Sequence, residues 1–432
     1  MQAYADILNY AIPFFIVLIL IEYAVSRYMS RTVIRFFDTI SSLSSGITNV
    51  VKDILGLSII IISYTFLYDH LAILDIRSSL LVYLVTFVGL DFAGYWSHRI
   101  NHSVNLFWNR HVIHHSSEEY NLACALRQSI SEVFAIYTLL YLPLAILGIK
   151  PEVIAIVAPI HLFAQFWYHT RLIDKMGVFE YILVTPSHHR VHHAVNPQYI
   201  DKNFSQIFIV WDKLFGTFQP EIPEEVPIYG ITKQVNTWNP WIINFQHLWR
   251  LALDALYTKS WSDKLKVWFM PTGWRPADRR NINEHESDIY NRPKYSSKSS
   301  LAMNYFVVFE LLSVLCLMLY FFSIIGTLDI YQLLLNGLLI FITIFSYTSL
   351  MDGSIIAIPA TFVKFALGVT IFYLEGYSWF EIERNISFGN MLVLSYLTLS
   401  TLGTLYFYYY DKPVSTTFNE HLPQRSKLVH TV

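Results

Sequence analysis

The residues of this chain whose types and spacing could do chemistry are its histidines. Of 16 histidines in 432 residues, 11 fall between His98 and His193. Eight of these 11 form three motifs: His98-x3-His102, His111-x2-His114-His115 and His189-x2-His192-His193. Side chains three or four residues apart lie on the same face of a helix. Each motif therefore predicts imidazoles gathered on one helical face.

Clustered imidazoles are typical of a metal site, because histidine is the commonest metal ligand and suits zinc, iron and copper. A tetrahedral zinc site takes four protein ligands, or three and a water. The three motifs together exceed what one ion takes. With His169, which lies between the second and third motifs, the set of eight or nine ligands fits two metal ions in a shared pocket.

The remaining histidines are weighed differently. A single histidine in an apolar protein is more often a satisfied core or interface residue, so the isolated ones are not predicted as ligands: His70, His247, His285, His421 and His430. Two others are intermediate. His161 lies inside an apolar run and could donate a hydrogen bond to a ligand, and His188 neighbours the third motif but is out of register with it.

The elements that must position these histidines are predicted to be membrane helices. The chain is 54% hydrophobic and 14% charged, whereas a soluble domain carries about 25% charged residues. This composition excludes a disordered chain, a basic nucleic-acid binder and most soluble enzymes. A bilayer-spanning helix needs about 20 apolar residues. The runs that qualify are 9–28, 52–70, 79–99, 130–148, 152–170, 301–325, 330–350, 354–374 and 389–410.

The distribution of basic residues predicts the orientation of these spans. Lysine and arginine follow the first run and are frequent in the polar middle of the chain, but are rare around 70–78, 149–151 and 326–329. Because cytosolic loops carry the excess of basic residues, we expect the N-terminus outside and the C-terminus in the cytosol. All three motifs and His169 then lie at the cytosolic face. The runs 130–148 and 152–170 could instead form a re-entrant hairpin.

The expected fold is therefore all-α. It is a polytopic transmembrane helical protein of about nine spans, with a cytosolic histidine-rich helical cap that holds a dimetal site. Residues 1–300 form the catalytic membrane domain, with five apolar segments in 1–170 and the cap in 171–300. Residues 301–432 form a four-span domain with a polar tail and, up to residue 410, no histidine. The tryptophan-rich segment Trp238–Trp274 is expected along the membrane interface or as a lid over the metal site.

The motif order HxxxH, HxxHH, long gap, HxxHH resembles the fatty acid hydroxylase and sterol desaturase superfamily of integral membrane enzymes. The segments around the motifs resemble the alkylglycerol monooxygenase family in particular. These are DFAGYWSHR (Asp91–Arg99), HHSSEEYNLACALRQS (His114–Ser129), QFWYHT (Gln165–Thr170), TPSHHRVHH (Thr185–His193), DKNF (Asp201–Phe204) and WDKLFGTF (Trp211–Phe218).

This resemblance implies a di-iron monooxygenase that uses O2 and tetrahydrobiopterin. Its reaction would hydroxylate the ether-linked carbon of an alkylglycerol to give a fatty aldehyde and a glycerol derivative. The implied partners are a lipid from the bilayer and O2, with no nucleic acid, and a homo-oligomer is allowed. The location would be the endoplasmic reticulum in a eukaryote or the inner membrane in a bacterium. The implied iron ligands are His98, His102, His111, His114, His115, His189, His192 and His193, with His169 as the ninth.

Acidic and amide residues near the motifs are further site candidates, because ligating histidines usually donate their second N–H to a carboxylate or carbonyl. Asp91 precedes His98 by two helical turns within an apolar run, where an acid is by default a functional hypothesis; a structural ion pair is the alternative. Others could orient ligands or meet the cofactor or lipid head, or could simply favour a helix N-terminus. These are Glu118, Glu119 and Asn121 after the second motif, Asp201 and Asn203 after the third, and, more weakly, Glu132. Of this set, Asp91, Glu119 and Asn121 are the predicted catalytic residues.

Two alternatives stay open at this point. Another hydroxylase or desaturase of the superfamily, acting on a sterol, sphingolipid, fatty acid or carotenoid, would share every metal ligand. A metal transporter or sensor is disfavoured, because transporters bind near the bilayer midplane and these motifs lie at or beyond the ends of the spans. No Glu-x-x-His lies next to the motifs, which argues against a soluble type of di-iron bundle.

Overall fold

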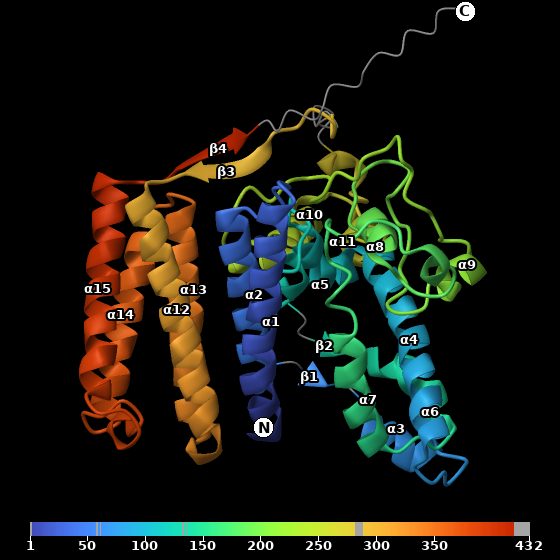
Figure 1. The fold of residues 1–432 in the computed structure, drawn as a ribbon, viewed down its shortest axis with the longest axis horizontal. Helices are drawn as coiled ribbons and strands as arrows, with labels where there is room; N and C mark the ends of the chain where they lie inside the picture. Colours follow the sequence, from blue (N-terminus) through green and yellow to red (C-terminus); the bar gives the residue numbers. More distant parts are fainter. Residues whose placement is uncertain are drawn as a thin grey trace, which may run out of the picture.

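The structure is a computed structural model that describes residues 2–57, 59–60, 62–131, 134–135, 137–280 and 288–418. Helices dominate it (Figure 1). The helices are α1 (Gln2–Tyr28), α2 (Phe36–Ile54), α3 (Tyr64–Leu71), α4 (Leu80–Ser103), α5 (Asn105–His115), α6 (Leu142–Ile146), α7 (Pro151–Phe163), α8 (Pro186–His192), α9 (Val210–Phe215), α10 (Pro240–Tyr257), α11 (Trp261–Phe269), α12 (Leu301–Ile324), α13 (Ile330–Met351), α14 (Ala357–Leu374) and α15 (Gly389–Tyr410). The strands are β1 (Ile59–Ile60), β2 (Phe134–Ala135), β3 (Lys294–Lys298) and β4 (Val414–Phe418).

Six helices in the described residues are long and apolar enough to cross a membrane, rather than the expected nine. They lie within α1, α4, α12, α13, α14 and α15. The expected span 52–70 is interrupted. Gly56 takes a positive φ of 61° just after α2, and Ile59–Ile60 then pairs in parallel with Phe134–Ala135. A hydropathy window averages over such a break, because it reads composition and not backbone hydrogen bonding.

The expected spans 130–148 and 152–170 are also replaced by shorter elements. In their place stand two short apolar helices, Tyr137–Ile146 and Pro151–Phe163. Gly148 reverses the chain between them with φ of 82°, and a Cβ there would lie 1.8 Å from the carbonyl oxygen of Leu74. Only glycine fits so close a backbone approach at positive φ. This geometry agrees with the hairpin alternative for these two runs.

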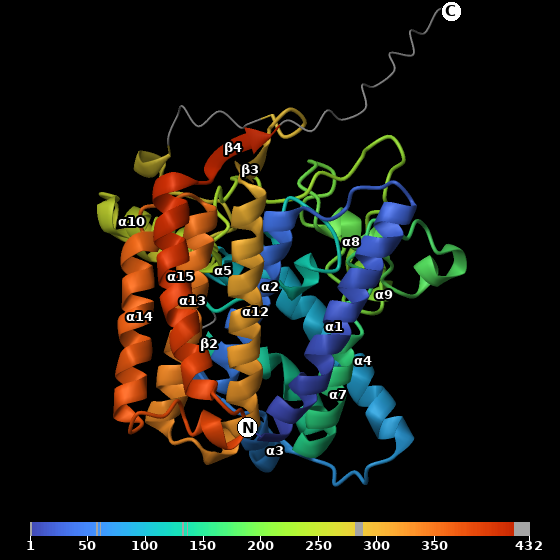
Figure 2. The same cartoon turned by 60° about the vertical axis from the view of Figure 1, so that its left-hand side comes forward.

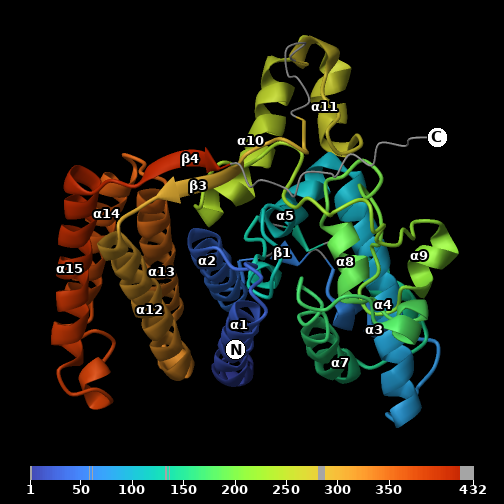
Figure 3. The same ribbon diagram turned by 45° about the horizontal axis from the view of Figure 1, so that its top comes forward.

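The histidine-bearing elements meet at one end of the molecule. The C-terminal end of α4 lies at the same end as α5, α8, α10 and the paired strands β3 and β4, while the N-terminal end of α1 lies at the opposite end (Figure 1). Figure 3 shows α10 and α11 side by side next to α5, and both contact it. The tryptophans of this region divide between two environments: Trp238 is buried in the core, and Trp249 and Trp261 are exposed.

The four C-terminal helices α12–α15 pack together and against α2. Figure 1 places α2 between this block and the histidine-bearing helices, and Figure 2 shows the four helices of the block beside one another. One apolar cluster unites α2, α12 and α13, with Val51, Val314 and Ile344 among its fully buried members. The segment 291–300 contains β3, which pairs antiparallel with β4 beyond the last helix. The C-terminal helices therefore share a core with the rest of the chain.

A buried polar cluster holds α12, α14 and α15 together within their apolar lengths. The ammonium of Lys364 lies 3.8 Å from a carboxylate oxygen of Glu310, and both side chains are fully buried. Tyr396 donates a hydrogen bond of 2.9 Å to the same carboxylate. Charges at such a depth persist only when they are paired, so this cluster specifies how the three helices pack.

Candidate metal centre

The nine histidines predicted as ligands converge into two groups. The first contains His98, His102, His111, His115 and His192, and the second His114, His169, His189 and His193. Within each group, one ring nitrogen of every histidine lies within 4.8 Å of the others. All are buried except His111, which is half-buried. Each group could therefore hold a metal ion, and the two groups are adjacent because both draw on α5 and on the third motif.

The C-terminal ends of three helices place most of these rings. The first motif occupies the last turns of α4, the second ends α5, and the third spans α8 and its C-terminal cap. Helix α8 begins with Pro186 at its first position, where a missing N–H costs nothing. His188 closes its capping box by accepting a hydrogen bond from the backbone N–H of Thr185. This contact explains why His188 is out of register with the ligands.

Backbone carbonyls orient the rings from outside. The Nδ1–H of His98 donates to Phe204 O at 2.7 Å, and that of His192 donates to Lys202 O at 2.9 Å. His169 directs Nδ1 to Gln165 O at 3.1 Å. Such partners fix the tautomer of a ligating histidine and turn its other nitrogen toward the metal. In these rings the unprotonated Nε2 therefore points into its group.

One carboxylate has the same role. Asp201 lies 3.3 Å from Nδ1 of His102, which matches the ligand-orienting one of the roles considered for it. Asn203, two residues on, instead holds the loop by donating to His188 O and Gln219 O. Both residues adopt positive φ angles of 57° and 55°, which asparagine and aspartate tolerate better than most residues.

The inward nitrogens fit metal ions. Nε2 of His98 lies 2.8 Å from Nε2 of His111, and Nε2 of His169 lies 3.0 Å from Nε2 of His189. The protons of His98 and His169 are already used on carbonyls, so their lone pairs face a neighbouring nitrogen at close range. A cation between them would satisfy these lone pairs. Among the residues that the structure describes, Nε2 of His192 has no hydrogen-bond partner although it is buried, as expected of a metal ligand.

The charge state of the histidine rings also suits metal binding. Burial lowers the pKa of His111, His115, His189, His192 and His193 well below the ordinary histidine value, and the neighbouring histidines lower it further. The rings are therefore neutral at physiological pH, and neutral imidazole is the form that binds a metal.

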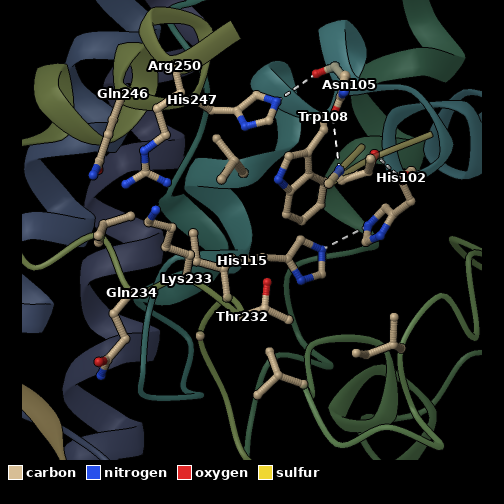
Figure 4. A pocket seen from close by; sticks show the side chains of 18 of the residues that line it. His102, Asn105, Trp108, His115, Thr232, Lys233, Gln234, Gln246, His247 and Arg250 are labelled. Atoms are coloured by element: carbon tan, nitrogen blue, oxygen red, sulfur yellow. Dashed lines mark hydrogen bonds between the residues drawn. The ribbon is translucent and has the colours of Figure 1, made fainter. Parts of the chain in front are cut away.

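A cavity of about 870 Å³ opens beside the first group, with His102, His115 and His192 on its wall. Figure 4 shows Arg250, Lys233, Gln246 and Gln234 gathered at one side of it, and Trp108 and His102 toward the other. His247 also lines the cavity. It belongs to neither histidine group and pairs through Nε2 with Asn105 O at 2.9 Å, in keeping with its exclusion as a ligand.

Asp91 has a different place from the one predicted. Its fully buried carboxylate contacts Nε2 of His161 at 2.9 Å and none of the nine ligands is among its hydrogen-bond partners. It also accepts from the backbone N–H groups of Ile207 and Phe208 and from the indole N–H of Trp211, at 2.8–3.0 Å. Asp91 thus ties α4 to α7, to α9 and to the segment before α9, and the structural-pair alternative describes its contacts, with His161 of another helix as the partner.

Replacement of Asp91 by asparagine is expected to destabilise the protein by about 3 kcal/mol or more, because an amide N–H₂ would face N–H donors that lose their buried acceptor. A lower melting temperature of the purified protein would show it. Asp75→Asn, which alters a carboxylate that is 87% exposed, should leave the melting temperature unchanged. An Asp91→Asn protein that melts like the parent would contradict the bracing role.

Glu119 and Asn121 also serve as ties. Glu119 binds the guanidinium of Arg171 at 2.7 Å and the ammonium of Lys294 at 2.8 Å. Asn121 donates to Val33 O at 2.8 Å and accepts from the backbone N–H of Cys124. None of these partners is a histidine. The two residues connect the loop after the second motif to other parts of the fold, and Glu132 lies outside the described residues.

The structure adds two residues that the sequence reasoning did not single out. Asp212 accepts from the backbone N–H groups of Phe204 and Ser205, both at 2.8 Å, and so fixes the carbonyl that orients His98. Arg127 is buried, binds Asp38 at 2.7 Å, and offers its own carbonyl to Nδ1 of His114. Both lie in segments that carry the family resemblance, which was the available signal.

The histidine region coincides with a known family pattern. The family model described as fatty acid hydroxylase matches residues 83–217, which include all nine histidines. Alkylglycerol monooxygenase of Homo sapiens is 36% identical over 351 residues, covering 80% of this chain and 78% of that protein. The chain belongs to the alkylglycerol monooxygenase family. The family protein of Xenopus tropicalis is 37% identical over 298 residues (68% of this chain, 66% of that protein). The one from Danio rerio is 39% identical over 279 residues (63% and 60%).

No solved structure matches the chain. Membership of the alkylglycerol monooxygenase family makes the protein an oxidoreductase, a lipid monooxygenase. Together with the six apolar helices, it also makes the protein an integral membrane enzyme. The predicted resemblance and the predicted enzyme class are therefore confirmed.

Proposed function

We propose that the protein hydroxylates the ether-linked carbon of alkylglycerols with O2 and tetrahydrobiopterin. One oxygen atom enters the C–H bond, and two electrons from the reduced pterin, with two protons, convert the other into water. The resulting hemiacetal separates into a fatty aldehyde and a glycerol derivative. The observation that carries the proposal is the pair of histidine groups at the edge of a polar cavity, in a chain with alkylglycerol monooxygenase relatives.

Two iron ions held by the two groups would supply the activation of O2, which amino-acid side chains alone do not provide. The chain's own residues would hold and orient the substrate. His102, His115 and His192 bring the first group to the cavity wall, and Lys233 and Gln246, which line the same cavity, provide polar contacts for a glycerol head. This arrangement would place the carbon next to the glycerol oxygen nearest the histidines.

The substrate would come from the bilayer, because the cavity lies at the end of α4, one of the apolar helices long enough to span it. We place this end at the cytosolic face on the strength of the basic residues in the middle of the chain. The membrane would be the endoplasmic reticulum of a eukaryote or the inner membrane of a bacterium.

Membranes that contain the protein should convert a 1-O-alkylglycerol to the corresponding fatty aldehyde when O2 and tetrahydrobiopterin are supplied. The aldehyde is measured by chromatography against consumption of the pterin, and the two amounts should match. A monoacylglycerol of the same chain length is the control, because its ester-linked carbon carries no hydrogen to be hydroxylated. If no aldehyde forms while a sterol, sphingolipid or fatty acyl chain is oxidised, another activity of the superfamily replaces this one.

A further inference from the structure

One wall of the histidine-lined cavity is a single loop. Residues 230–236 all line it, one after another, and they belong to no helix or strand. A loop without backbone pairing of its own depends on contacts at its ends for its position. The contacts at its downstream end lead outside the catalytic part of the chain.

That downstream end is held by the turn between α13 and α14. Asp352, directly after α13, accepts a hydrogen bond from the backbone N–H of Trp238 at 2.8 Å and another from the hydroxyl of Thr237. The hydroxyl of Tyr295 in β3 donates to the same carboxylate at 2.9 Å. Burial raises the pKa of Asp352 to about 6, with these three donors opposing the rise. The carboxylate is therefore ionised at neutral pH and accepts all three hydrogen bonds.

Neighbouring contacts reinforce this connection. The amide of Asn239 donates to the Ser349 hydroxyl in α13 at 2.9 Å, and Ser41 in α2 donates to the carbonyl of Trp238 at 2.7 Å. At the cavity side, the amide of Gln234 donates to Glu118, which follows the second histidine motif. The loop is thus fixed next to the histidines by Gln234 and in its first half by Arg292, which donates to the carbonyls of Ile231 and Thr232. At its downstream end it is held by the C-terminal helices.

We propose that Asp352 is a positioning residue for the substrate cavity, and that the C-terminal membrane helices thereby set the shape of the lipid-head site. The proposal rests on the proposed function in one respect, namely that the cavity receives the head of the lipid. Helices α12–α15 contribute no residue to either histidine group. Through Asp352 they would nevertheless have a role in substrate binding. Asp352 is not one of the residues that line the cavity. It acts on the cavity wall through its hydrogen bonds with Thr237 and Trp238.

The test compares Asp352→Ala and Asp352→Asn in the purified, iron-loaded full chain. Asp352→Ala should raise KM for a 1-O-alkylglycerol about tenfold while kcat changes less than about twofold, because the ligands are untouched. Amide hydrogen exchange in 230–238 should become faster, and that of α8 should not. Asp352→Asn keeps one acceptor oxygen and should recover most of the KM. The matched control is Asp329→Asn, which changes the same residue type at the other end of α13, where it caps the helix.

The proposal would be overturned if Asp352→Ala left both the KM and the amide exchange of the loop unchanged. It would also be overturned if the variant lost kcat and bound iron while the exchange of the loop stayed the same. If Asp352→Ala does not fold, Thr237→Val removes one donor to the carboxylate and serves in its place. The exchange measurement uses no substrate. A protein that leaves alkylglycerols unchanged but shows faster loop exchange would refute the proposed function alone, and leave the role of Asp352 in holding the cavity wall in place.

Discussion

Replacement of His192 by alanine is expected to abolish turnover and to lower the bound iron from about two ions per chain to about one. The buried Nε2 of His192 faces the first group and has no hydrogen-bond partner among the described residues. Loss of this side chain therefore removes one metal ligand from that site. The fall in turnover should exceed about 100-fold, the upper end of what losing a hydrogen-bonding partner of a ligand costs. Aldehyde formation and iron analysis of the same preparation would measure both effects.

The control for this change is His70→Ala, since His70 is an exposed histidine that belongs to neither group. It should keep full iron content and turnover. Full activity in His192→Ala would remove the third motif from the site. Loss of activity with both ions retained would mean that His192 orients the substrate and does not bind metal.

The second large effect is expected for His169→Ala. His169 is the one member of the two groups that lies outside the three motifs, and it supplies one of the four nitrogens of the second group. Three histidines would remain there, with a gap at the position that now lies 3.0 Å from His189. We expect a loss of turnover as large as that of a motif histidine, and loss of about one iron per chain.

His161→Ala is the matched control, because His161 lies eight residues earlier in the chain, is similarly buried, and contacts Asp91 instead of either group. It should retain both irons and melt at a lower temperature. If His169→Ala keeps two irons and normal turnover, three histidines are sufficient for the second site. His169 would then lie beside the motif histidines without binding the metal.

The sequence predicted the candidate ligands, which the fold does bring together, because spacing within a helix is local geometry. Positions separated by three or four residues share a face whatever the rest of the chain does. The sequence did not predict that the nine histidines divide into one group of five and one of four. His114 and His115 are neighbours in α5 but belong to different groups, since consecutive residues point about 100° apart around a helix.

The membrane spans were predicted only in part. Hydropathy located all six of the long apolar helices, because apolar composition over a window of that length is itself the physical cause of insertion. It also predicted three spans that the fold breaks up, and it did not predict α2. The serines of α2 are buried through contacts with distant residues, such as Ser41 with Trp238 and Ser45 with Gln128, so its composition looked too polar.

By itself, then, the sequence predicted which histidines are candidate ligands and how many ions they would suit, and it identified the family to which the chain belongs. Only the tertiary structure decided what the acids near the histidines do. Asp91 meets donors that lie 116–120 residues away, and Asp352 reaches a loop 114 residues earlier. A carboxylate is recognisable from sequence, but its partner depends on which segments the folded chain brings within hydrogen-bond distance.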